Sequence, residues 1–239
     1  MKQVTINQIS PLDYSGAEAM NSICTNLTFA GRNLKKILIT SNDQSDGKSW
    51  LTMHIAINLA ERGRRVLLID ADLRRSFLVQ RYKLKFEDEG IGLAHYLTGQ
   101  CSLDDCVYET NKYGMCLMPA GRDVTNPLAL MDTPYFAEML NELARHFDVV
   151  LLDAPPVGVV IDAAEIAACC DGTVLVVEHK KTRLREIAEC KRQMEQSGTP
   201  VLGCIINKVT FSGISEKRYY NRTYYRHYQR AYEREERQP

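Results

Sequence analysis

The sequence predicts a doubly wound α/β fold, in which a parallel sheet is covered by helices on both faces, and three observations support this prediction. Short, continuous apolar runs recur along the chain, a pattern typical of strands that are buried on both faces. Helical stretches separate these runs, as the crossover connections of a parallel sheet require. Two of the runs end abruptly at Asp70 and Asp153, which would place both carboxylates at the same edge of the sheet.

Turn-forming residues bound the predicted elements. Ser10 and Pro11 lead into the first helix, and Gly63 ends the second one. Residues 82–93 combine charged residues with two glycines, and we expect them to form a surface excursion. The predicted strands cover residues 36–40, 65–70, 147–153, 173–178 and 201–207, and the predicted helices cover residues 16–30, 48–62, 134–146 and 184–196.

Composition limits the classes of protein to which the chain can belong. Its 239 residues (27.2 kDa) include 30 Lys or Arg and 30 Asp or Glu, so there is no bulk attraction to nucleic acid or to an anionic membrane. No stretch reaches the roughly 18 apolar residues of a membrane span, and the first residues lack the apolar run of a signal peptide. The eight cysteines show no Cys-x-x-Cys spacing, which indicates reduced thiols. We therefore expect a cytoplasmic globular protein.

The chain divides into three predicted segments. Residues 1–36 form an N-terminal helical arm that is available for a subunit contact, residues 37–211 form the main α/β domain, and residues 212–239 form a flexible tail. The tail holds six of the twelve tyrosines, seven Lys or Arg and four Glu, a local charge of +3. Because it has too few aliphatic residues to build a core, we expect a mobile segment or a helix that depends on a partner.

A candidate phosphate-binding loop follows the first predicted strand. Segment 41–49 ends in Gly-Lys-Ser and leads directly into a helix, whose N-terminal backbone N–H groups favour polyphosphate. We expect Lys48 to reach the outer phosphates and the Ser49 hydroxyl to ligate Mg²⁺. Gly-Lys-Ser alone is a weak signal, and Asn42 stands where a standard P-loop has glycine. The position between a buried strand and a helix favours a phosphate loop over an ordinary turn.

Three aspartates complete the predicted site. Asp70, Asp72 and Asp153 follow apolar strands and would emerge at the edge of the sheet that carries the loop. Mg²⁺ prefers carboxylate and phosphate oxygens, so this set of residues predicts ATP with Mg²⁺ as the ligand. We interpret Asp162 and Asp171, by contrast, as ordinary cap or turn residues.

These motifs resemble those of the bacterial tyrosine kinases (BY-kinases) of capsular and exopolysaccharide biosynthesis. Residues 41–49 match the Walker A loop of this family, residues 66–75 match its Walker A′ motif, and residues 149–156 match its Walker B strand. The strings Asp-Ala-Asp-Leu-Arg-Arg and Asp-x-Pro-Pro are the most specific matches, and the tyrosine-rich end completes the resemblance. The resemblance implies a P-loop NTPase-like fold and ATP-dependent phosphorylation of protein tyrosines.

The resemblance also implies partners and a location. The main phosphate acceptor would be the tail of a neighbouring copy, so the kinase would self-associate for phosphorylation in trans. A separate membrane adaptor of the polysaccharide co-polymerase type would activate it at the inner face of the cell membrane, and a tyrosine phosphatase would reverse the modification. The output would be control of capsule or exopolysaccharide synthesis and export.

The matched positions imply a role for each residue. Lys48 would contact the transferred phosphate, and Asp70 would orient or deprotonate the incoming tyrosine. Asp72 and Asp153 would hold Mg²⁺ together with Ser49, although the roles of Asp70 and Asp72 could be exchanged. The predicted nucleotide-binding residues are Gln44, Ser45, Asp46, Gly47, Lys48, Ser49, Trp50 and, at the adenine, Asn207. The predicted phosphate acceptors are Tyr219, Tyr220, Tyr224, Tyr225, Tyr228 and Tyr232.

Two departures from the family pattern bear on function. BY-kinase loops usually read Pro-Gly before the acidic residue, whereas this chain has Gln44-Ser45 there. Because serine accepts a positive φ less readily than glycine, we expect a different loop or weaker nucleotide binding. A Glu-x-x-Arg-x-x-Arg motif joins subunits of the family into a ring, but Asn21 and Cys24 stand in place of both arginines after Glu18. We therefore expect the protein to assemble poorly by itself.

Three alternative interpretations compete with an active kinase. A partitioning or septum-positioning ATPase shares the fold, but it carries a signature lysine where this chain has Asp43, and it lacks a tyrosine-rich end. A nucleic-acid-binding module could use the interleaved Tyr and Arg of the tail as a stacking platform, but the neutral net charge argues against nucleic acid. The altered loop also allows a catalytically weak kinase homologue. Trp50 and His54, one helical turn apart, are expected to pack together rather than to act chemically.

Overall fold

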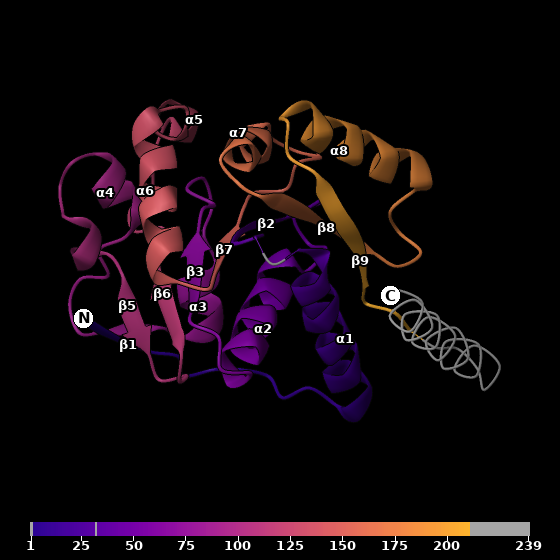
Figure 1. Ribbon diagram of the computed structural model, residues 1–239, viewed down its shortest axis with the longest axis horizontal. Coiled ribbons are helices and arrows are strands. Elements are labelled where there is room, and N and C mark those ends of the chain that lie inside the picture. Colours follow the sequence, from indigo (N-terminus) through magenta and orange to yellow (C-terminus); the bar gives the residue numbers. More distant parts are fainter. Residues whose placement is uncertain (1, 32, 211–239) are drawn as a thin grey trace, which may run out of the picture. The chain divides into compact units, whose positions relative to one another are not determined.

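The computed structural model describes residues 2–31 and 33–210. Residues 2–207 belong to one compact unit, and residues 208–210 belong to a second one. Within the described part of the first unit, nine strands form one sheet with helices on both faces (Figure 1). The strands are β1 (Lys2–Thr5), β2 (Lys36–Ser41), β3 (Val66–Asp70), β4 (Lys85–Phe86), β5 (Tyr108–Thr110), β6 (Met115–Met118), β7 (Val149–Asp153), β8 (Gly172–Glu178) and β9 (Val201–Asn207). The α-helices are α1 (Tyr14–Ala30), α2 (Lys48–Glu61), α3 (Leu78–Tyr82), α4 (Leu93–Leu97), α5 (Pro127–Met131), α6 (Pro134–His146), α7 (Asp162–Ala168) and α8 (Leu184–Gln196).

The doubly wound arrangement occupies most of the sheet. The order of the strands is β4-β1-β5-β6-β3-β7-β2-β8-β9, and every pairing from β6 to β9 is parallel. Helices connect these parallel strands, as the alternation of apolar runs and helical stretches predicts. The predicted fold class is therefore confirmed.

The sequence pattern does not predict the opposite end of the sheet. There β1 pairs antiparallel with β4 and parallel with β5, and β5 pairs antiparallel with β6. These strands have between two and four residues, too few for a continuous apolar run to stand out. Residues 82–93 contain β4, so their description as a surface excursion is wrong in part. Residues 1–36 contribute β1 to the sheet in addition to the predicted helix.

Apolar side chains form a layer on each face of the sheet, because successive residues of a strand point to opposite faces. In β2, the buried Ile37 and Ile39 contribute to the layer beneath α1, α2 and α3, whereas Leu38 contributes to the layer beneath α4 to α8. Burial on both faces is what the unbroken apolar runs predict. Each fully buried Leu or Ile contributes about 1.5–3 kcal/mol relative to an exposed one, so these layers hold the strand ends in fixed positions.

The register of the central strands brings the ends of β2, β3 and β7 together. Asp70, the last residue of β3, pairs with Asp153, the last residue of β7. Asp153 also pairs with Ile39 of β2, and the phosphate loop begins two residues further along that strand. The predicted loop and the predicted aspartates therefore share one edge of the sheet.

The remaining expectations concern the tail, membrane-spanning helices and two further predicted helices. The flexible tail predicted over 212–239 lies outside the described residues. In residues 2–31 and 33–210, no helix combines the length and the apolar composition that a membrane crossing requires. The predicted helices over 134–146 and 184–196 coincide with α6 and α8.

Candidate active site

The phosphate loop turns sharply at Gly47, immediately before α2. Gly47 has a φ of 94°, in the left-handed region that strains any residue with a Cβ. A Cβ at this position would also lie 2.2 Å from Asn207 Nδ2, so only glycine lets the end of β9 approach the loop this closely. The Gly47 carbonyl accepts a hydrogen bond from the Leu51 N–H at 3.0 Å, which continues the turn into α2. The N-terminus of α2 therefore lies at the carboxyl edge of the sheet, where phosphate groups bind in this class of fold.

Two of the predicted nucleotide-binding residues also hold the loop itself. Asp46 is fully buried, and its Oδ2 accepts a hydrogen bond from the Asp43 N–H at 2.8 Å. The Asp46 carbonyl accepts a second one from Asn207 Nδ2, also at 2.8 Å, and burial raises the pKa of the Asp46 carboxyl. Neither Gln44 nor Ser45 has a positive φ. The Gln-Ser departure thus introduces no left-handed strain into this loop, and weaker nucleotide binding stays a prediction.

Lys48, the first residue of α2, extends to the ends of β3 and β7. Its Nζ lies 3.5 Å from Asp72 Oδ2 and 3.7 Å from Asp153 Oδ1, and it donates a hydrogen bond to Ser49 Oγ at 3.3 Å. Burial works to lower the pKa of Lys48, but the charges of Asp153 and Asp72 outweigh it and raise that pKa. The structure thus brings together a charged ammonium group, a hydroxyl and two carboxylates that the sequence separates by up to 105 residues.

Asp70 and Asp153 are almost completely buried, each with 1% of its surface exposed. Asp70 Oδ2 accepts a hydrogen bond from Ser76 Oγ, and its Oδ1 accepts one from the Asp72 N–H at 3.3 Å. Burial and the neighbouring charge of Asp153 raise the pKa of Asp70 to about 8. Burial also raises the pKa of Asp153, although the charge of Lys48 opposes this shift. Two carboxylates, those of Asp72 and Asp153, thus share the single ammonium group of Lys48, and this charge imbalance favours an additional cation.

The donor atoms fit Mg²⁺ that arrives with a nucleotide. Mg²⁺ takes oxygen ligands and is usually bound by one or two carboxylates together with phosphates and waters. Ser49 Oγ, Asp72 Oδ2 and Asp153 Oδ1 surround Lys48 Nζ and supply such oxygens. In the part of the chain that the structure describes, no group of three or more His, Cys, Asp or Glu could hold a metal by itself.

The remaining predicted residues have separate locations. Trp50 is half-buried on the first turn of α2 and packs against His54 with ring centroids 4.2 Å apart, as their spacing predicts. Burial lowers the pKa of His54 and thereby favours the neutral ring. The six predicted phosphate acceptors, Tyr219, Tyr220, Tyr224, Tyr225, Tyr228 and Tyr232, lie outside the described residues.

An ion pair beside the site involves a residue that the sequence does not single out. Asp162, interpreted above as a cap or turn residue, has a buried carboxylate that pairs with Arg74. Arg74 Nη2 donates to Oδ1 at 2.9 Å, and Arg74 Nε donates to Oδ2. Arg74 belongs to the Asp-Leu-Arg-Arg string that matches the family motif, so the sequence draws attention to this residue. No local pattern, however, links Arg74 to Asp162, a partner 88 residues away.

Lys181 is a second residue that sequence reasoning missed. It lies between β8 and α8, and its Nζ is 3.1 Å from Asp43 Oδ2 and 3.2 Å from Ser45 Oγ. It is also 3.8 Å from Asp46 Oδ1, an oxygen that accepts no hydrogen bond from the residues that the structure describes. Lys181 therefore offsets part of the negative charge of the phosphate loop.

The two positions at which the family motif has arginine face α2 in this protein. Cys24 is fully buried, its Sγ lies 3.9 Å from the Ile55 carbonyl oxygen, and burial raises its pKa to about 12. Asn21 Oδ1 accepts hydrogen bonds from Asn58 Nδ2 at 3.1 Å and from Arg62 Nη2 at 3.0 Å. Both residues therefore make contacts between α1 and α2 within one molecule.

Comparison with known proteins places this site in a family. The AAA domain family matches residues 34–196. The chain is 39% identical over 204 residues to the tyrosine-protein kinase CpsD of Streptococcus agalactiae, which covers 85% of this chain and 88% of that protein. The kinase domain of the Escherichia coli tyrosine kinase ETK matches with a TM-score of 0.75 and 27% identity, over 83% of this chain and 79% of that one.

A septum site-determining protein matches over a smaller share of the chain. The septum site-determining protein MinD of Pyrococcus horikoshii, solved in complex with Mg-ADP, has a TM-score of 0.61 and 25% identity, over 72% of this chain and 69% of that one. Its match supports the nucleotide-binding fold, whereas the tyrosine kinases match over a larger share of the chain. This protein therefore belongs to the bacterial tyrosine kinases, and it is a protein-tyrosine kinase with a P-loop nucleotide-binding fold.

Proposed function

We propose that this kinase uses ATP and Mg²⁺ to phosphorylate the C-terminal tyrosine cluster of another copy, and that this reaction regulates the synthesis or export of a capsular polysaccharide or exopolysaccharide. The observation that carries the proposal is the position of Lys48 Nζ, 3.5 Å from Asp72 and 3.7 Å from Asp153. The buried Asp70 lies beside them. Phosphoryl transfer requires positioning and charge neutralisation more than covalent chemistry, and these groups supply both.

Each residue of the site has a proposed task in the transfer. Backbone N–H groups at the start of α2 bind the phosphates, and the Lys48 ammonium offsets the charge of the transferred group. Ser49, Asp72 and Asp153 hold Mg²⁺, which supplies further charge neutralisation at the phosphate oxygens. Asp70 orients the tyrosine hydroxyl and accepts its proton. Its position supports this task, because Asp70 ends β3 directly beside Asp153 of β7 and two residues before Asp72.

The nucleotide lies, in this proposal, along the phosphate loop and the end of β9. The residues that bind it are Gln44, Ser45, Asp46, Gly47, Lys48, Ser49, Trp50 and Asn207. We assign Asn207 to the adenine from the family resemblance, and its position at the end of β9, against Gly47, supports a contact with the nucleotide. The remaining members of the set follow the loop into the first turn of α2.

Family membership supports a role at the membrane for the whole assembly. A membrane adaptor of the polysaccharide co-polymerase type recruits the kinase to the inner face of the membrane and brings copies together. Phosphorylation then passes between tails, and a tyrosine phosphatase resets them. Each phosphate adds about −1.5 to −2 charges near neutral pH, so two of them cancel the +3 charge of the tail.

Mixing two variants tests transfer between molecules. The donor carries Phe in place of all six cluster tyrosines, and the acceptor carries Lys48→Met with an intact tail. After incubation with ATP and Mg²⁺, peptide mass spectrometry should place phosphate on the acceptor's tail only when the donor is present. An acceptor that remains unmodified beside an active wild type, or phosphate confined to tyrosines outside the cluster, would contradict the proposal.

A further inference from the structure

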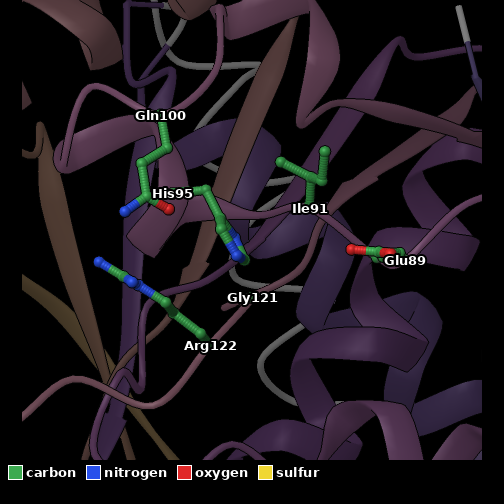
Figure 2. Close-up of a pocket in the computed structure, with 7 residues that line it drawn as sticks. Glu89, Ile91, His95, Gln100, Gly121 and Arg122 are labelled. Carbon is green, nitrogen blue, oxygen red and sulfur yellow. The ribbon is translucent and has the colours of Figure 1, made fainter.

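A pocket lies beyond the carboxyl end of β6, the strand that pairs with β3. It has a volume of about 470 Å³ and is lined mainly by Glu89, Ile91, His95, Gln100, Gly121 and Arg122 (Figure 2). Met118, the last residue of β6, pairs with Ile69, the residue that precedes Asp70. Neighbouring strands lie about 4.8 Å apart, so Asp70 and the segment that carries Gly121 and Arg122 leave the sheet side by side.

Two glycines fix the ring of His95 in the wall of this pocket. A Cβ at Gly92 would lie 2.1 Å from the Pro119 carbonyl oxygen, and a Cβ at Gly121 would lie 2.6 Å from His95 Nδ1. His95 Nδ1 accepts a hydrogen bond from the Gly92 N–H at 3.1 Å. In the neutral ring the proton is then on Nε2, so His95 presents an N–H donor from a fixed position.

The two ends of the pocket carry opposite charges. Arg122 and Gln100 lie at one end, and Glu89 lies at the other, with Ile91 between Glu89 and His95 (Figure 2). With its amide oxygen turned toward Arg122, Gln100 accepts two hydrogen bonds from the guanidinium, at 3.0 and 3.2 Å. Guanidinium groups bind phosphate in a bidentate manner. The pocket therefore offers a phosphate site, an apolar side chain for an aromatic ring and a carboxylate for a cation.

The tail sequence contains a repeated unit with a matching chemical pattern. Tyr-x-Arg occurs four times at intervals of four residues, beginning at Tyr220, Tyr224, Tyr228 and Tyr232. After phosphorylation, each unit combines an aryl phosphate with a guanidinium two residues later. In an extended peptide these two side chains lie on the same side, about 7 Å apart. One unit thus carries an anion, a ring and a cation in the order in which the pocket offers their partners.

We propose that this pocket binds a phosphotyrosyl-x-arginine unit from the tail of another copy, with the phosphate at Arg122 and the arginine at Glu89. The inference rests on the proposed function, because that reaction supplies the phosphorylated tail. The repeat interval has a consequence for catalysis. Four extended residues span about 13 Å, and β6 is the direct neighbour of β3, so in this proposal a bound unit presents a neighbouring tyrosine of the repeat toward the strand end that carries Asp70. Phosphorylation of one tyrosine then promotes phosphorylation of the next.

Fluorescence polarisation with the full chain tests the pocket without requiring catalysis. The labelled peptide reproduces residues 222–230 with phosphate on Tyr224, and it is compared with the unphosphorylated peptide and with one that carries Arg226→Gln. Charge-assisted hydrogen bonds justify an expectation of at least about tenfold tighter binding for the phosphopeptide. Arg122→Gln should abolish this difference. Glu89→Gln should weaken binding only of peptides that retain Arg226.

The matched control is Arg145→Gln, because Arg145 is an exposed arginine on α6 and belongs to a different surface ion pair. Equal affinity of the wild type, Arg122→Gln and Arg145→Gln for the phosphopeptide would overturn the inference, as would equal binding of the peptide with and without phosphate. The mixing experiment with the Lys48→Met acceptor is independent of this result. If the tail is phosphorylated but Arg122→Gln binds the phosphopeptide normally, the inference fails and the proposed function stands.

Discussion

Arg74 and Asp162 form a two-point ion pair that joins the segment after β3 to the first turn of α7. The Asp162 side chain is 1% exposed, whereas the Arg74 side chain is 39% exposed. Arg74 follows Asp72 by two residues, and Asp72 lies 3.5 Å from Lys48 Nζ. The pair therefore restrains the backbone that carries two of the three candidate catalytic aspartates.

Asp162→Asn should impair catalysis more than nucleotide binding. Removing one partner of a fully buried pair costs about 3–5 kcal/mol, and the partial exposure of Arg74 reduces our expectation to about 1–3 kcal/mol. Urea unfolding measures that loss, and steady-state kinetics should show a lower kcat with little change in the KM for ATP. The control is Asp104→Asn at an exposed position. A kcat equal to that of the wild type would show that the ion pair does not position the aspartates.

Lys48→Met should abolish tyrosine phosphorylation while the protein stays folded. Lys48 is the cation that reaches the carboxylates of β3 and β7, and loss of such an electrostatic contact costs about a hundredfold or more in rate. Anti-phosphotyrosine blotting measures the rate, and circular dichroism checks the fold. Lys191→Met, which removes an exposed lysine of α8, serves as the control. An unchanged phosphotyrosine signal from Lys48→Met would contradict the assignment of the site.

Gly47→Ala should weaken nucleotide binding through two separable effects. The left-handed φ of 94° strains alanine by about 1–3 kcal/mol, and the new Cβ would collide with Asn207 Nδ2. Gly63→Ala isolates the first effect, because Gly63 has a φ of 82° and a Cβ added there would meet nothing within 4 Å. Isothermal titration with ATP and urea unfolding measure both variants. Gly47→Ala should be the more damaging one, and adding Asn207→Ala should recover part of its stability.

Cys24→Arg should destabilise the protein rather than restore subunit contacts. Cys24 is fully buried against Ile55, and a charge placed there without a partner costs several kcal/mol. The temperature at which Cys24→Arg unfolds should therefore be well below the unfolding temperature of the conservative Cys24→Ala control. Light scattering measures the size of the assembly and tests the opposite expectation, that arginines restore subunit contacts. If Asn21→Arg with Cys24→Arg forms a larger assembly at unchanged thermal stability, the orientation of α1 derived from these contacts is wrong.

Asp88→Asn should reduce stability at neutral pH but not at low pH. Burial opposes ionisation, but hydrogen bonds from Lys2, the Gly90 N–H and Tyr108 lower the pKa of Asp88 to about 2. Because the folded-state pKa is below the unfolded value, the carboxylate stabilises the fold above about pH 5 and loses this effect as the pH falls toward 2. Solvent screening limits our expectation to about 1 kcal/mol.

Urea unfolding at a series of pH values measures this contribution. The difference between the wild type and Asp88→Asn should be largest near neutral pH and should shrink toward about pH 2. Tyr108→Phe removes only one hydrogen bond and should reproduce part of the loss. A difference that is independent of pH would show that Asp88 does not contribute through its charge.

Much of the site was predictable from the sequence because its chemistry lies at the ends of local patterns. The apolar runs before Asp70 and Asp153 identify strands, and the helix after Gly-Lys-Ser identifies the phosphate loop. In a parallel sheet the carboxyl ends of strands meet at one edge, so these local signals imply spatial proximity. The structure agrees, with Lys48 3.5 Å from Asp72 and 3.7 Å from Asp153.

Only the tertiary structure decided the features that depend on distant partners. No periodic pattern links Arg74 to Asp162, Asn207 to Gly47, or the short strand β1 to its neighbours β4 and β5. The burial of Cys24 against α2 and the charged ends of the pocket beside β6 also depend on residues that are far apart in the sequence. The sequence by itself determined the strands β2, β3, β7, β8 and β9, the loop and the reactive residue types, because local periodicity and turn chemistry encode them. The tertiary structure determined which charges face one another, because packing selects those pairs among residues far apart in the chain.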